Sequence, residues 1–238
     1  MTLTNQDNTI LGCGTISNLT FVNDFTVNGN NTTGAMELLN DVVTNSGMIE
    51  ATAKGGMAIM SSSVTNTGSI EATTSANLSI SNSTVTGGKI AASALFATVS
   101  LGNSNLIGCN LSIAIGATLQ VAGGPRSTIS GGAFTNAGKV MIGDQATLAF
   151  QGTINNAGGQ IDINAGPLGA TLLLAGAATV NGGLVKLINS NSTPMLQGAT
   201  PAVLLTNHST IEGSGSLSYI SVLIGVLFLF GFGRQIDV

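Results

Sequence analysis

Along most of the chain, single apolar residues alternate with Ser, Thr, Asn or Glu in short runs. Residues 69–72 read SIEA and residues 77–81 read NLSIS. This period of two is typical of a β-strand with one buried face, whereas helical spacing is nowhere sustained. The runs end at Asn-Gly-type turns, where positive φ costs little. The pattern therefore predicts many short strands joined by tight corners.

The runs themselves repeat at a fixed spacing: residues 43–52 read VTNSGMIEAT, residues 64–73 read VTNTGSIEAT, and a shorter copy begins at Val85. Units this short bury their apolar face only when successive copies stack. We therefore predict an all-β, single-stranded, parallel β-helix (a β-solenoid) with about 21 residues per coil. About nine or ten coils would form a rod roughly 45 Å long. The predicted ladders are Val43, Val64 and Val85; Ile49, Ile70 and Ile90; Asn45 and Asn66 at a corner; and Asn136 and Asn156 farther along.

A longer repeat overlies the short one, since the sequence around Thr9 returns around Thr210, 201 residues later. We interpret residues 1–218 as a β-solenoid that holds one long module of about 201 residues and the start of the next. Its uncapped ends would expose strand edges, so we expect self-association through them. Residues 219–233 form an apolar C-terminal segment. Three interpretations of this segment stay open: a cap, a short membrane anchor, or an end that is not native to the module. Residues 234–238 form a polar tail.

The spacing of the repeats is longest between Ile161 and Val180. Insertions in solenoids emerge as loops on one face. We therefore expect a loop here, and expect it to carry any binding specificity.

The amino-acid composition limits which functions and partners are expected for the chain. Hydrophobic residues make up 43% of the chain, which is too many for a disordered protein. Only six residues are basic and the formal net charge is −4, so a nucleic-acid partner, which requires clustered Lys and Arg, is not expected. With 7% charged residues, the solvent-facing surface must consist largely of Ser, Thr and Asn.

The ten acidic residues are dispersed, and only Glu50 and Glu71 are predicted neighbours, one coil apart on the same ladder. As a pair they could bind a cation or act as general acid and base. The favoured interpretation is two solvated, outward-facing carboxylates, which interact weakly, because Ala91 and not a third acid occupies the next rung. We expect no catalytic residue, cofactor or metal site.

His208 is the sole histidine. A catalytic histidine needs an orienting partner, and none is evident, so we expect a surface turn residue. Cys13 and Cys109 are too few for a disulfide framework or a zinc site. We expect each of them to be a small buried apolar residue.

The units VTNTGSIEA (residues 64–72) and GCGTIS (residues 12–17) resemble repeats of large exported bacterial proteins of the filamentous-haemagglutinin and autotransporter-passenger type. The resemblance covers nearly all of residues 1–218. It implies a right-handed parallel β-helix that serves as a stalk or adhesive surface, and a location at the cell surface or outside the cell. The first residues contain no signal peptide.

These observations predict a structural or adhesive segment without catalysis, whose partner would be a host or cell-surface glycan or protein. One alternative is a carbohydrate-binding or polysaccharide-cleaving β-helix, which would require acids that converge on one groove. Another is an ice-binding solenoid, suggested by Thr44, Thr65 and Thr86, although this threonine row is predicted to end after three rungs.

Overall fold

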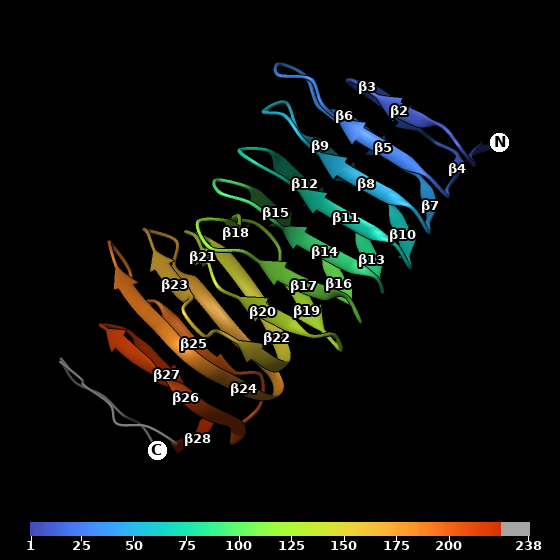
Figure 1. Ribbon diagram of the computed structural model, residues 1–238. Helices are drawn as coiled ribbons and strands as arrows, with labels where there is room; N and C mark the ends of the chain where they lie inside the picture. The colour runs from blue at the N-terminus through green and yellow to red at the C-terminus, as the bar shows by residue number, and fades with distance from the viewer. Residues whose placement is uncertain (225–238) are drawn as a thin grey trace.

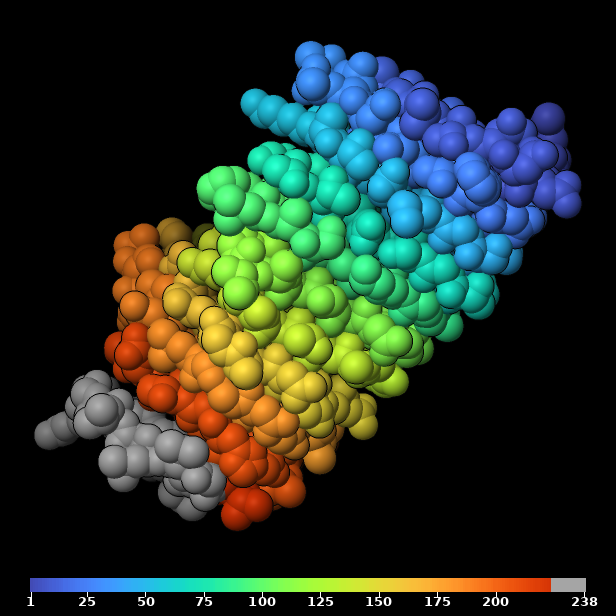
Figure 2. Space-filling model, in the orientation of Figure 1, coloured from blue at the N-terminus to red at the C-terminus, as the bar shows by residue number. Residues whose placement is uncertain are grey.

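The computed structural model describes residues 1–224 and shows a parallel β-solenoid of about 11 turns (Figure 1). Residues 1–224 contain no helix and are 63% strand, with about 21 residues per turn, so the predicted fold class is confirmed. The expected number of coils was slightly low. At about 4.8 Å per turn the rod is roughly 50 Å long. Figure 2 shows the turns as successive layers, from the N-terminal end to the C-terminal end.

Each turn has three short strands, which stack on their equivalents into three faces. The first face consists of β1 (Thr2–Asn5), β4 (Thr20–Asn23), β7 (Val42–Asn45), β10 (Ser63–Asn66), β13 (Thr84–Thr86), β16 (Asn105–Ile107), β19 (Ser127–Ser130), the start of β22 (Ala146–Asn155), the start of β24 (Ala170–Asn189), β25 (Met195–Gly198) and β27 (Ser216–Ser218). The second face consists of β2 (Thr9–Leu11), β5 (Thr26–Gly29), β8 (Met48–Ala51), β11 (Ser69–Ala72), β14 (Lys89–Ala92), β17 (Asn110–Ile113), β20 (Phe134–Asn136), the end of β22, the middle of β24, the start of β26 (Val203–Gly213) and β28 (Ile220–Ile224). The third face consists of β3 (Gly14–Ser17), β6 (Met36–Leu39), β9 (Met57–Met60), β12 (Asn77–Ser81), β15 (Thr98–Gly102), β18 (Thr118–Val121), β21 (Lys139–Ile142), β23 (Gln160–Ala165), the end of β24 and the end of β26.

The predicted aliphatic ladders are present in the predicted register. Val64 pairs in parallel with Val43 and Val85 on the first face. On the second face, Ile70 pairs with Ile49 and Ile90. All of these side chains are buried in one continuous core, and burying an aliphatic side chain of this size contributes about 1.5–3 kcal/mol.

The corner between the first and second faces, here called the first corner, contains a ladder of buried asparagines. The side-chain Nδ2 of Asn45 donates to Oδ1 of Asn66 at 2.8 Å, and Nδ2 of Asn23 donates to Oδ1 of Asn45 at 2.7 Å. Asn5 extends the ladder by one more turn. Each amide also donates to backbone carbonyl oxygens of the turn, so these buried polar groups are satisfied.

The asparagine ladder changes corner in the second half of the rod. Nδ2 of Asn136 donates to Oδ1 of Asn156 at 2.7 Å, as predicted, but both residues lie at the second corner, between the second and third faces. The asparagine motif therefore follows the second face in this half of the rod, whereas it follows the first face in the N-terminal half. Thr9 and Thr210, which mark the longer repeat, correspondingly lie on different faces, in β2 and β26. The division into long modules stays a prediction.

The third corner, where the chain returns from the third face to the first, contains a ladder that the sequence did not reveal. Oγ of Ser62 accepts the backbone N–H of Asp41 and donates to the carbonyl oxygen of Met60. Ser83 and Ser104 repeat this arrangement at the next two turns, and Oγ of Ser127 accepts the backbone N–H of Ser104. Each hydroxyl therefore satisfies a buried backbone N–H of the preceding turn.

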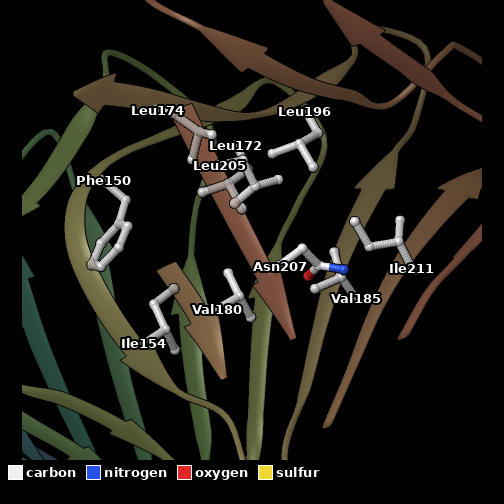
Figure 3. Close-up of a pocket in the computed structure, with 10 residues that line it drawn as sticks. All are labelled: Phe150, Ile154, Leu172, Leu174, Val180, Val185, Leu196, Leu205, Asn207 and Ile211. Carbon is white, nitrogen blue, oxygen red and sulfur yellow. The ribbon is translucent and has the colours of Figure 1, made fainter. Parts of the chain in front are cut away.

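The turns near the C-terminal end are wider, because the step along the chain from Leu172 to its partner Leu196 is longer than the step from Val43 to Val64. The loop predicted between Ile161 and Val180 is wrong, because only residues 166–169 lie outside strands there. The extra residues lengthen strands around the corners, as in the 20-residue β24, and do not form a projecting loop. Figure 3 shows the interior of these turns, where the apolar side chains leave a cavity of only about 10 Å³, near the smallest that can hold one water.

The apolar C-terminal segment, residues 219–233, begins with β28, which pairs in parallel with β26. Its remaining residues and the polar tail 234–238 lie outside the described residues, so the cap, the anchor and the non-native end all stay open. Within residues 1–224, no helix has the length and apolar character needed to cross a membrane.

Candidate functional site

Glu50 and Glu71 are neighbours, as predicted: they pair in register on the outer side of the second face. The next rung holds Ala91. Each carboxylate has its own partner, because Nδ2 of Asn28 donates to Oε1 of Glu50 at 2.8 Å and Nζ of Lys89 lies 3.2 Å from Oε2 of Glu71. The pair is therefore a short polar row with its own hydrogen bonds.

The environment of Glu50 favours its neutral form. Burial, and secondly the nearby charge of Glu71, raises the pKa of the Glu50 carboxyl from its ordinary value of 4.5. Among residues 1–224, no three His, Cys, Asp or Glu side chains come together as metal ligands, and this pair has no third acid beside it.

A second charged row, which sequence reasoning missed, lies on the outer side of the third face. Asp162 pairs in register with Lys186, which pairs with Glu212. The carboxylate of Asp162 is almost fully buried beneath two side chains: Nζ of Lys139 lies 2.7 Å from it, and Nε2 of Gln160 donates to it at 2.6 Å. The turns that bring Lys186 and Glu212 into this row are longer than the regular period, so a fixed period does not align these charges.

Beside this row, the second corner contains an open groove of about 360 Å³, here called the corner notch. Its lining comes from three successive turns: Gly116, Ala117, Thr118, Ala137, Gly138, Lys139, Gly158 and Gln160. The notch exists because the corner shortens. Four residues (114–117) connect β17 to β18, but only two (137–138) connect β20 to β21 on the next turn.

Acidic side chains do not converge on the corner notch. Its lining includes no carboxylate, and Asp162 lies behind Lys139 and Gln160 and is paired with both. Convergence of acids on one groove was the condition set for a polysaccharide-cleaving β-helix. This groove therefore gives that alternative no geometric support.

The threonine row has the predicted extent. Thr65 pairs with Thr44 and Thr86, and the next rung holds Ile107. A row of three rungs is a small surface for ordering water, so the structure adds no support for ice binding.

The lone histidine and the two cysteines lie apart. His208 is exposed, as predicted, but belongs to β26 and not to a turn, because the corner strands of the wide turns are continuous. The prediction of a buried Cys13 is wrong: Cys13 is exposed at the second corner of the first turn, between β2 and β3. Cys109 is buried as predicted, and burial raises the pKa of its thiol to about 11.

No protein-family model, curated protein sequence or solved structure matches this chain. The likeness to filamentous-haemagglutinin and autotransporter-passenger proteins therefore has support only at the level of the solenoid fold.

Proposed function

We propose that the chain is a structural and adhesive solenoid segment: a stiff spacer that holds polar faces toward an outside surface. The observation that carries this proposal is the continuity of the strand pairing. Three faces of parallel strands run through about 11 turns with no break in the pairing within residues 1–224, and buried asparagine or serine ladders support several of the corners. A rod held together along its whole length by backbone pairing resists bending.

The outer surface fits this role. Its faces carry rows such as Thr44, Thr65 and Thr86, and charged residues make up only 7% of the chain. Neutral hydroxyl and amide rows form hydrogen bonds that salt screens little, in contrast to contacts between exposed charges. The partner under this proposal is a glycan or protein at the surface of a host or neighbouring cell, and the segment acts at the cell surface or outside the cell.

The experiment immobilises the purified chain on beads and measures their retention under flow on surfaces coated with cell-surface glycans or matrix proteins. We expect retention that resists raised salt. The matched control is Val64→Asp, which places a charge in the core and should unfold the rod. Equal retention of the folded and unfolded chains would contradict adhesion by the solenoid. Small-angle scattering tests the spacer separately, because a compact particle much shorter than roughly 50 Å would contradict it.

A further inference from the structure

The strongest unexplained feature of the surface is an apolar ridge at the second corner, made by Leu95, Phe96 and Ile115. These residues are 52%, 69% and 79% exposed. In Figure 1 the loops that connect the second face to the third project from one edge of the stack. The ridge occupies two such neighbouring loops, β14 to β15 and β17 to β18.

The fold does not require apolar residues in the ridge. The same turn recurs on three successive rungs, each closed by a backbone hydrogen bond from the N–H of Ala76, Ala97 or Ala117. On the first of these rungs, the two exposed residues of the turn are Thr74 and Ser75, at the positions that Leu95 and Phe96 occupy on the next rung. Polar residues therefore suit this corner, one turn away.

The backbone of Phe96 has a conformation that disfavours a bulky side chain. Ser75, Phe96 and Gly116 occupy the same turn position, with φ of 56°, 62° and 75°. Positive φ at the third residue of a turn favours Gly and disfavours a bulky side chain. Phe96 thus occupies a strained position and exposes its ring to solvent, which benefits neither the turn nor the core.

The ridge lies directly beside the corner notch. The backbone N–H of Phe96 donates to the carbonyl oxygen of Gly116 at 2.9 Å, and the side chain of Leu95 lies against Gly116, which lines the notch. A projecting apolar ridge and a hollow lined by small residues are therefore neighbours on one edge of the rod.

We propose that this edge binds a second copy of the chain. A twofold axis that passes between ridge and notch places the ridge of each copy in the notch of the other, which gives a closed, isologous dimer. Charge does not oppose this contact, because Lys139 at the notch is paired with Asp162 and the net charge of the chain is only −4. Only three exposed apolar residues of each copy enter this contact, and small interfaces are typical of transient complexes, so we expect a reversible dimer.

Two variants test opposite halves of the contact by sedimentation velocity over a wide concentration range. Phe96→Ser copies the residue of the preceding rung and removes the ring, and we expect it to weaken dimerisation roughly tenfold or more. Ala137→Leu fills the notch and leaves the ridge intact, and it should also weaken dimerisation. If association were unspecific attraction between apolar surfaces, Ala137→Leu would strengthen it instead, which would overturn the proposal.

The control is Val42→Thr, which removes an equally exposed apolar side chain from the first face and should leave the dimer unchanged. Because Phe96→Gly relieves the strained φ, this variant should melt at the same or a higher temperature while dimerising weakly, which separates the contact from folding. A chain that stays monomeric at every concentration would overturn the proposal. So would an open-ended series of oligomers unaffected by Phe96→Ser, since that is the behaviour of association through strand edges at the rod ends.

Discussion

The buried asparagine ladder can be tested at its middle rung with Asn45→Leu. Asn45 is fully buried and has neighbours of the same kind on both sides. Its Nδ2 donates to Oδ1 of Asn66 and to the carbonyl oxygens of Gly47 and Ser69, at 2.8, 3.2 and 3.3 Å. Leucine has a similar volume but neither donates nor accepts hydrogen bonds.

The expected loss follows from the groups left behind. In the described part of the chain, Oδ1 of Asn66 has no donor other than Asn45, so it becomes a buried unpaired acceptor, at a cost of about 1–3 kcal/mol. Asn23 loses its acceptor but keeps its bond to the carbonyl oxygen of Met48. The hydrogen bonds from Asn45 to the carbonyl oxygens of the turn are lost as well. In total we expect the free energy of unfolding to fall by about 3 kcal/mol, which corresponds to a fall in melting temperature of about 6–12 °C.

Urea unfolding followed by circular dichroism measures this loss, with Thr44→Val on the exposed side of the same strand as the control, expected within about 0.5 kcal/mol of the parent. The double variant Asn45→Leu with Asn66→Leu should also be less stable than the parent, but by less than the sum of the two single losses, because their shared hydrogen bond is removed only once. A loss below about 1 kcal/mol for Asn45→Leu would refute the interpretation of the ladder as a stabilising element.

Four further predictions concern other polar and ionisable groups. Asp41 occupies the serine position of the third corner with a buried Oδ2 that has no partner, so Asp41→Ser should complete the ladder and stabilise the chain by about 1 kcal/mol in urea unfolding at pH 7; an equal or lower stability would contradict this. Burial raises the pKa of Asp41, and of Glu50, above their ordinary values of 3.8 and 4.5, so the folded state binds more protons than the unfolded state between the ordinary and the raised pKa values. Stability should therefore increase as pH falls through that window, and Asp41→Ser with Glu50→Gln should flatten the profile; a parent profile without this slope would count against it. Lys139→Met should cost about 1–3 kcal/mol because the buried Asp162 carboxylate loses its cation and keeps only the hydrogen bond from Gln160, whereas Lys186→Met, beside an exposed Glu212, should cost under about 1 kcal/mol. Finally, iodoacetamide should alkylate Cys13 and not Cys109 in the native chain, as counted by mass spectrometry, and two modifications before unfolding would contradict the burial of Cys109.

The regular half of the fold could be predicted from the sequence because the spacing of the repeats is constant there. Val43, Val64 and Val85 each lie one full turn apart, so aligning the repeats is the same as aligning the strands. The pairing of Glu50 with Glu71 followed from the same register. No knowledge of the corners was needed for either.

The later turns could not be predicted in the same way. The step from Leu106 to its partner Ile129 is longer than the regular period, the next steps return to about that period, and the steps near the C-terminal end are longer again. One fixed spacing therefore does not align the later turns. The ion pair of Lys139 and Asp162 was missed for a different reason: the rung partner of Asp162 is Met141, and Lys139 reaches the carboxylate diagonally from two residues earlier in the same strand as Met141. Cys13 was misjudged because its sequence neighbours resemble those of Cys109, although Cys13 lies at the second corner and Cys109 at the first corner.

The transfer of the asparagine ladder from the first corner to the second also bears on how such a chain folds correctly. In a repetitive sequence, a strand can pair with a neighbour one unit too far along and lose little energy, which traps misaligned intermediates. An error of this kind in residues 43–92 cannot extend past Asn136, because there the asparagines and tight turns occupy a different corner. The irregular middle of the rod thus discriminates against slipped alignments that its uniform part would tolerate.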